Sequence, residues 1–257
     1  MKIVVHDTGH STSATICAAF AAGCGAEVHR EQRENEADSI AFFYGVLRQN
    51  IRLFRTLADS KRDFLFCDNG YMRRGHFDGY YRITRNAWCH DGLGAPDHAR
   101  LDNLSIEIKP WRKDGDIILV CPPIPEYCET WKLDGVEWQR RVVRRLRKVT
   151  KRPIVIRHKP TDPRADQDQP PLDEQLARTR ALVAHDSNVA LEAAIAGVPV
   201  FVTGPSPARA LACDDVFKIE TPYYPDNRRE VLAVLAANQW TLAEMRDGTA
   251  QRALGVI

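Results

Sequence analysis

Short apolar runs alternate with segments of helical periodicity along most of the chain. The apolar runs predict strands at residues 2–6, 26–29, 63–67, 116–121, 153–156, 181–184 and 200–203. The segments between them predict helices at 12–22, 39–49, 49–58, 136–149, 188–196 and 228–237, and the tail from Thr241 is also expected to be helical. Alternating strands and helices are typical of parallel sheets covered by helices. The pattern therefore predicts an α/β fold.

The composition changes near residue 110, after Lys109-Pro110-Trp111. This change predicts two Rossmann-like, doubly wound halves with a central cleft between them. We expect an N-terminal domain at 1–110 and a C-terminal domain at 111–257. The last helix could pack back on the N-terminal half.

Composition excludes several classes of protein. The 257 residues carry 36 Lys and Arg against 34 Asp and Glu, and 44% are hydrophobic, as in an ordinary globular protein. The chain lacks an apolar run long enough to cross a membrane, so no membrane insertion is expected. The first residues lack the apolar core of a signal peptide, and the seven cysteines form no Cys-x-x-Cys pair. Reduced thiols in the cytoplasm fit this pattern.

Residues 182–201 are the most informative stretch. They predict a strand, a polar corner at His185-Asp186-Ser187-Asn188, a helix containing Glu192, and a second strand after Gly197. Ser187 is expected to be the N-cap of that helix, whose free amides attract phosphate. Ligands bind at the carboxyl ends of strands in such sheets, and the polar corner occupies one of those ends.

This stretch resembles the donor-binding element of GT-B fold glycosyltransferases. The resemblance implies that Ser187 and Asn188 face a donor diphosphate, with His185 beside them, and that Glu192 binds ribose or sugar hydroxyls. It also implies a nucleotide-sugar donor, expected to be a UDP-sugar, that the C-terminal domain binds, and an acceptor that the N-terminal domain binds. Sugar-nucleotide epimerases share the pattern, and a plain βαβ unit without a ligand is the structural alternative.

Arg157-His158-Lys159-Pro160 follows another predicted strand. Its cationic side chains could bind a pyrophosphate through charge-assisted hydrogen bonds. The segment looks similar to the basic residues followed by Pro in capsule-type GT-B transferases. A solvated loop is the alternative. No metal site is expected, because Asp166-Gln167-Asp168 lies in a polar loop and a cationic cradle makes a metal unnecessary.

Asp7, His10 and Asp68 are the candidate general bases. Each lies at a predicted strand end, and an inverting transferase needs a base within hydrogen-bond reach of the attacking hydroxyl. Neutral His10 can accept a proton near pH 7, whereas a carboxylate gains basicity when it is desolvated. Helix capping and turn formation are the alternative roles, and the choice among the three stays open.

Residues 68–88 interleave aromatic with basic and amide side chains and contain few aliphatic ones. A surface that stacks bases and contacts phosphates needs this mixture. The stretch looks similar to small glycosyltransferase-like proteins of tailed bacteriophages, which implies an acceptor in double-stranded DNA. The candidate acceptor-binding residues are Tyr71, Arg73, Tyr81, Arg82, Arg85 and Asn86. A packed loop with half-buried rings is the alternative.

A basic stripe runs from Gln139 to Lys159, with ten Lys and Arg residues and no Asp or Glu. On a nearly neutral protein such a stripe could bind phosphates. Anionic headgroups or an acidic glycan would suit it equally, and a solvated helix face is the alternative.

The sequence favours a GT-B glycosyltransferase that moves a hexosyl or pentosyl group from a nucleotide sugar to a hydroxyl. The favoured acceptor is the hydroxymethyl group of a modified pyrimidine, such as 5-hydroxymethylcytosine, in phage DNA. The alternatives are a capsule or lipid-glycan glycosyltransferase, a sugar-nucleotide epimerase, and a non-catalytic module that binds a nucleotide sugar or DNA. Fold alone does not separate these classes.

Overall fold

The structure is a computed structural model that describes residues 2–30, 38–46 and 50–257. The chain divides into two compact units. The first contains Met1–Trp88 together with Asn238–Ile257, and the second contains Cys89–Ala237. The chain thus leaves the first unit once and returns to it for its last twenty residues.

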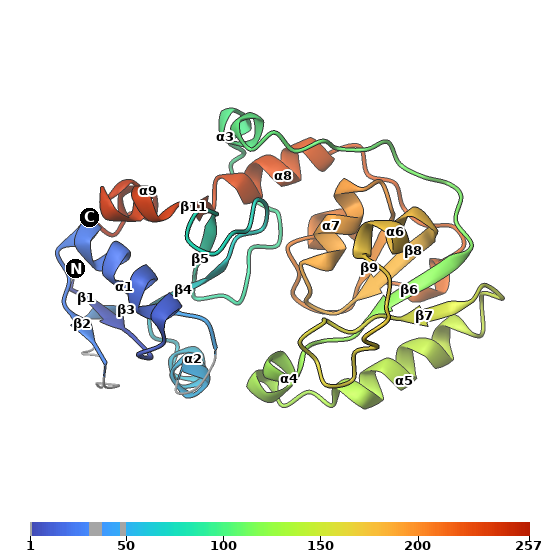
Figure 1. The fold of residues 1–257 in the computed structure, drawn as a ribbon, viewed down its shortest axis with the longest axis horizontal. Helices are drawn as coiled ribbons and strands as arrows, with labels where there is room; N and C mark the ends of the chain where they lie inside the picture. Colours follow the sequence, from blue (N-terminus) through green and yellow to red (C-terminus); the bar gives the residue numbers. More distant parts are fainter. Residues whose placement is uncertain (1, 31–37, 47–49) are drawn as a thin grey trace. The chain divides into compact units, whose positions relative to one another are not determined.

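The first unit is built around a six-stranded sheet within the described residues, in the order β11-β5-β4-β3-β1-β2 (Figure 1). Strands β2, β1, β3 and β4 are parallel, while β5 and β11 add an antiparallel edge. Its elements are β1 (Lys2–His6), α1 (Ser11–Cys24), β2 (Val28–His29), β3 (Ser39–Tyr44), α2 (Asn50–Asp59), β4 (Phe64–Asn69), β5 (Tyr81–Arg85), β11 (Gln239–Trp240), α9 (Leu242–Arg246) and α10 (Thr249–Ala253).

The prediction of a helix at 39–49 is wrong over its described part up to Tyr44, because Ser39–Tyr44 is the central strand β3. The predicted segment at 47–49 lies outside the described residues. Ile40, Phe42 and Phe43 are fully buried, since both faces of a central parallel strand are covered. Such a continuous apolar run has no period that separates a buried strand from a buried helix.

Helices cover both faces of the first sheet. Successive strand residues point to opposite faces. Phe42 stacks on Phe20 of α1, with ring centroids 3.7 Å apart, whereas Phe43 meets Phe54 of α2 edge-on at 6.2 Å. The unit is therefore doubly wound.

The C-terminal tail is part of the core of the first unit. Trp240, Leu242 and Met245 belong to the same buried cluster as Phe20 and Phe42. The fully buried Gln251 side chain donates to the backbone oxygens of Phe20, at 2.6 Å, and Met245, at 2.8 Å. Both apolar packing and buried hydrogen bonds thus hold the tail on α1.

The second unit contains a five-stranded parallel sheet in the order β10-β9-β8-β6-β7 within the described residues (Figure 1). Its elements are α3 (His98–Asn103), β6 (Ile117–Cys121), α4 (Pro125–Trp131), α5 (Gly135–Leu146), β7 (Ile154–Ile156), α6 (Leu172–Ala177), β8 (Thr179–Ala184), α7 (Val189–Ile195), β9 (Val200–Val202), η1 (Arg209–Leu211), β10 (Ala212–Cys213), η2 (Val216–Lys218) and α8 (Arg228–Ala236).

The amphipathic helix α5 covers one face of the second sheet. Trp138, Val142 and Leu146 repeat every four residues and pack against Ile118 and Val120 of β6. Asp134 begins the helix, because its carboxylate accepts hydrogen bonds from the amides of residues 136 and 137.

Both sheets share one connection pattern. In each unit the first strand lies between the second and the third, which gives the 2-1-3-4-5 order of doubly wound sheets. The prediction of an α/β fold with two Rossmann-like halves is confirmed. In this order the connections diverge between the first and third strands, so a ligand is expected at the carboxyl ends of β1 and β3 or of β6 and β8.

No helix in the described part of the chain is both long and apolar enough to span a bilayer. All seven cysteines are free thiols.

Candidate functional site

Four strand ends line up at the carboxyl edge of the second sheet. Parallel pairing sets Cys121 opposite Ala184, and Ala184 opposite Val202. His185 and Thr203 are therefore the first residues beyond neighbouring strands. On the other side of β6, the Arg157 amide donates to the oxygen of Val120 at 2.9 Å. The register thus brings Arg157, Cys121, His185 and Thr203 into one row.

Charged side chains from two other elements influence the end of β6. Burial raises the pKa of the Cys121 thiol to about 12, Arg157 lowers it and Glu192 raises it. Because both side chains influence the same thiol, the predicted donor residues Arg157 and Glu192 both lie near the carboxyl end of β6. The structure therefore brings together these two residues, which are 35 positions apart in the sequence.

His185 lies in a cage of aromatic and hydroxyl groups. Its Nδ1 is 2.9 Å from the Thr203 hydroxyl, and the ring of Tyr127 meets it edge-on at 5.3 Å. Burial, with a contribution from Arg141, lowers the pKa of His185 to about 4. The imidazole is therefore neutral near pH 7, so it can bind a ligand as a hydrogen-bond donor or acceptor but not as a cation.

Trp138 binds the same hydroxyl group as His185. An indole N–H only donates, and Nε1 of Trp138 lies 2.8 Å from the Thr203 hydroxyl oxygen. The same hydroxyl therefore holds both the Trp138 indole and the His185 imidazole, and Nε2 of His185 is left to meet a ligand. The glycine at position 204 leaves room for the ring, since a Cβ there would lie 2.4 Å from His185 Cε1.

An ion pair between a buried carboxylate and a half-buried arginine holds the loop after β7. The Asp162 side chain is 2% exposed, and its two oxygens accept hydrogen bonds from Arg164 at 2.7 and 2.9 Å. Arg164 lowers the pKa of the Asp162 carboxyl, and burial lowers that of His158, whose Nδ1 lies 3.7 Å from Asp162. The pair is thus charged at neutral pH and fixes the loop that carries Lys159.

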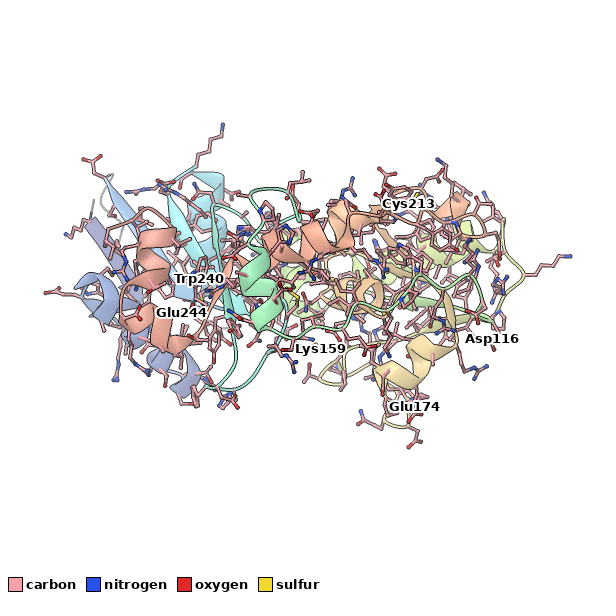
Figure 2. All side chains as sticks on the ribbon, turned by 90° about the horizontal axis from the view of Figure 1, so that it is seen from above. Asp116, Lys159, Glu174, Cys213, Trp240 and Glu244 are labelled. Atoms are coloured by element: carbon pink, nitrogen blue, oxygen red, sulfur yellow. The ribbon has the colours of Figure 1, made fainter. Side chains whose placement is uncertain are left out.

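The three basic candidates of this loop differ in what they contact. One Arg157 nitrogen donates to the oxygen of Pro170 and to Oε1 of Gln175, at 2.7 and 2.9 Å. His158 is half-buried, whereas Lys159 is exposed. In Figure 2, Lys159 lies well apart from Asp116, which precedes β6. Lys159 is therefore the basic residue of this loop best placed to meet a soluble ligand.

The corner after β8 begins α7 one residue later than predicted. Asn188 is the N-cap, and the Ser187 hydroxyl accepts a hydrogen bond from the Val189 amide at 3.3 Å. Ser187 therefore caps the helix with its side chain, from the position before the N-cap. Helix α7 has only seven residues, so its dipole contributes less to anion binding than the side chains of the row.

A cavity of about 360 Å³ opens beside Thr203 at the end of β9. It is lined by Cys89, Asp91, Thr203, Gly204, Pro205, Ser206 and Arg209. This volume is at the lower end of the range for small-molecule sites. Because Thr203 contacts both the cavity and His185, the cavity adjoins the row.

Asp7 and His10 follow β1 in the first unit. The Asp7 side chain is 3% exposed; its Oδ1 accepts from the Gly9 amide at 3.0 Å, and Oδ2 lies 4.0 Å from Nε of Arg30. Nδ1 of His10 accepts from the Thr12 amide at 3.3 Å and caps α1. A neutral His10 in this arrangement carries its proton on Nε2, so its basic nitrogen is engaged in the cap.

Asp68 lies near the end of β4 and is paired with Arg82. Nη2 of Arg82 is 2.8 Å from Oδ2 of Asp68, and the two side chains are 9% and 30% exposed. The guanidinium also lies over the rings of Phe66 and Tyr71. Within the first unit, this pair connects β4 and β5.

The other predicted acceptor residues are divided between core and surface. Tyr71 and Tyr81 are 2% and 1% exposed, so their rings cannot stack on a base unless the segment moves. Arg85 and Asn86 bind Asp63 at 2.7 and 2.6 Å, and this pairing orders the turn after β5. Arg73 is exposed.

Sequence reasoning missed the partners of His185. Trp138, Tyr127 and Thr203 come from α5, α4 and the end of β9, and no local motif connects them. The loop Gly204-Pro205-Ser206, directly after the strand predicted at 200–203, is the one signal that could have indicated the cavity. The described residues contain no group of three or more His, Cys, Asp or Glu side chains placed to hold a metal ion.

The fold places the chain among proteins built from two Rossmann-like units, and this architecture occurs in glycosyltransferases. The KpsC beta Kdo 2,7 transferase of Thermosulfurimonas dismutans matches with a TM-score of 0.59 and 13% identity, over 98% of this chain and 99% of that one. A KpsC beta Kdo 2,4 transferase of the same organism matches with a TM-score of 0.55 and 10% identity, over 91% and 90%. No family model and no curated protein matches the sequence. These similarities establish the fold.

Proposed function

We propose that the chain is a glycosyltransferase that uses a nucleotide-sugar donor. The observation that carries the proposal is the match of nearly the whole chain, 98%, to the fold of a Kdo transferase. The polar row at the carboxyl edge of the second sheet supports it, because this edge is where doubly wound sheets bind nucleotides.

In the proposed donor site, Lys159 and Arg157 offset the charge of the donor diphosphate as it leaves. Neutral His185 forms a hydrogen bond with the donor through Nε2. Glu192 accepts hydrogen bonds from donor hydroxyls, and Ser187 and Asn188 line the same corner. The cavity beside Thr203 receives part of the donor. The sequence predicts a UDP-sugar as the donor. Nucleotide-activated Kdo is a second candidate donor, because both structural neighbours are named Kdo transferases.

We propose Asp7 as the general base. It follows β1 at the position where connections diverge in the first sheet, which is the expected ligand edge. His10 is engaged in capping α1, and Asp68 is paired with the nearly buried Arg82. Asp7 would remove the proton from the acceptor hydroxyl, whose oxygen attacks the anomeric carbon while the bond to the donor phosphate breaks.

For the acceptor, we propose a glycan hydroxyl first and a modified pyrimidine in double-stranded DNA second. The named activity of the structural neighbours favours the glycan. Exposed Arg73 favours DNA, but burial of Tyr71 and Tyr81 removes two of the rings that base stacking would use. The roles of Arg82, Arg85 and Asn86 at the acceptor stay predictions. The domain assignments, the central cleft, the cytoplasmic localisation and the phage origin also stay predictions.

The test is a transfer assay with a panel of nucleotide sugars that includes UDP-hexoses and nucleotide-activated Kdo. The acceptors are Kdo-terminated glycans and DNA that carries 5-hydroxymethylcytosine or 5-hydroxymethyluracil, with unmodified DNA alongside. Mass spectrometry should show one sugar-sized gain on one acceptor class. Donor binding without turnover on any acceptor would indicate a non-catalytic module, and an isomerised donor would indicate an epimerase; either result contradicts the proposal.

Two variants locate the roles in the two units. Asp7→Asn should lower kcat by about 10²- to 10⁴-fold and leave donor binding intact, since a positioned base contributes about that factor. Lys159→Ala should weaken donor binding, and Lys113→Ala, at another exposed lysine of the second unit, is the matched control. If Asp68→Asn abolishes turnover in a stably folded protein while Asp7→Asn does not, Asp68 is the base.

A further inference from the structure

Helix α5 presents a strongly basic face to solvent. Its buried face is formed by Trp138, Val142 and Leu146, and the opposite positions carry Lys and Arg. The exposed basic residues of α5 and the turn after it are Arg140, Arg141, Arg144, Arg145, Arg147 and Lys148. They extend along most of a helix about 18 Å long. Of these residues, Arg141 also lies near enough to His185 of the proposed donor site to lower its pKa.

The positive charge of this face is almost uncompensated. Among the described residues, Arg144 is the one member of the set with a carboxylate within ion-pairing distance, and Oε1 of Glu137 lies 3.8 Å away. The face carries six positive charges, whereas the whole chain has a formal charge of only +2. The face is therefore complementary to an anionic surface.

Exposed apolar side chains flank the basic face. Trp131 ends α4 just before the turn into α5 and is 43% exposed, and Val136 in the first turn of α5 is 46% exposed. Val149 lies beyond the other end of the helix and is 36% exposed. Trp side chains favour the water–lipid boundary, where the ring meets the acyl region and the N–H meets the headgroups. Contacts with the phosphates of duplex DNA would leave these apolar groups without a role.

We propose that the basic face of α5, together with Trp131 and Val136, binds the surface of a bilayer that contains anionic lipid. The guanidinium and ammonium groups contact the headgroup phosphates, and Trp131 and Val136 enter the boundary between headgroups and acyl chains. Each basic residue close to an anionic membrane contributes to binding, and short apolar groups add to that attraction. The inference uses only the second unit and does not depend on the donor site.

Vesicle co-sedimentation of the full chain tests the proposal. Vesicles of phosphatidylcholine with phosphatidylglycerol should retain the protein, and vesicles of phosphatidylcholine alone should not. Replacing Arg140, Arg144, Arg147 and Lys148 by Gln should weaken binding at least about tenfold. The matched control replaces the exposed residues Arg52, Lys113, Lys218 and Arg246 by Gln, which removes the same charge elsewhere and should leave binding nearly unchanged.

Fluorescence quenching by brominated lipid tests the apolar contact. Binding to anionic vesicles with brominated acyl chains should quench part of the tryptophan emission. Trp131→Phe should lose that quenching while it still sediments with the vesicles. Because the chain has five tryptophans, this variant assigns the signal to Trp131.

Two results overturn the proposal. The first is an equal loss of vesicle binding in the control variant, in which Arg52, Lys113, Lys218 and Arg246 are replaced. Retention on duplex DNA but not on vesicles also overturns it and assigns the face to nucleic acid.

Discussion

His185 has a titratable side chain, but its imidazole ring is uncharged near pH 7 and is held in a fixed orientation. The ring is partly buried between Tyr127 and Trp138, and Thr203 contacts Nδ1. Desolvation disfavours the imidazolium, and no carboxylate ion pair to this ring offsets it among the described residues. In the proposed reaction such a residue can donate a hydrogen bond to a donor oxygen over the whole physiological pH range.

We expect His185 to make the folded state less stable as the pH falls from 6.5 to about 4, where the unfolded chain binds a proton that the folded chain does not. Because the ring is part exposed, the effect should be roughly 1 to 2 kcal/mol rather than the full value of the pKa shift. Urea unfolding measured across this window should show a flatter pH dependence for His185→Gln than for the unmodified protein. His76→Gln, at an exposed position, is the control; an equal flattening there would contradict the assignment to His185.

At the residue scale, the sequence predicts positions better than partners. Polar residues that follow buried strands are visible in the sequence, and this pattern predicts that His185, Asn188 and Arg157 lie at strand ends. The contact of His185 with Trp138 and Thr203 could not be predicted, since it depends on how α5 packs across the sheet. Likewise, the interleaved aromatic and basic residues at 68–88 do not reveal that Tyr71 and Tyr81 are buried.

At the element scale, the strands that lead into the site were predictable and β3 was not. Strands β6, β8 and β9 are short apolar runs bounded by turn residues, which is the pattern of buried parallel strands. The run Ser39–Tyr44 has the same character, but it precedes a second segment compatible with a helix, and neither composition nor period separates the two. Pairing with β1 and β4 makes it a strand, and such pairing is a long-range property.

The packing of α1 against the C-terminal tail gives a prediction at this scale. A Cβ on Gly23 would lie 2.0 Å from the backbone oxygen of Met245, so Gly23→Ala must push the tail away from α1. We expect a loss of about 1 to 3 kcal/mol in the free energy of unfolding, as for other overpacked sites. Thermal and urea unfolding of the full chain measure it. Ala22→Ser, at the exposed neighbouring position, should have little effect; equal losses would show that α1 itself, and not its contact with the tail, is disturbed.

At the scale of the whole molecule, the first unit depends on two segments that are far apart in the sequence. Residues 1–88 alone lack the apolar side chains that residues 238–257 add to the core, which are Trp240, Leu242, Met245, Ala250 and Val256. Each large buried apolar side chain stabilises a fold by about 1.5 to 3 kcal/mol, and the total stability of a domain is about 5 to 15 kcal/mol. Loss of the tail therefore removes most of the stability of this unit, whereas residues 89–237 retain their own sheet and core.

We expect residues 89–237 to unfold cooperatively as an isolated fragment, and residues 1–88 to do so only when a Gly-Ser linker joins them to 238–257. Urea unfolding followed by circular dichroism measures cooperativity in the three fragments. In the proposed function, 89–237 should also bind the nucleotide sugar by calorimetry without transferring it, because Asp7 is absent. Cooperative unfolding of 1–88 alone, with the same midpoint as the linked fragment, would show that the tail is dispensable. The two-unit division would then have to be redrawn with a first unit that ends at Trp88.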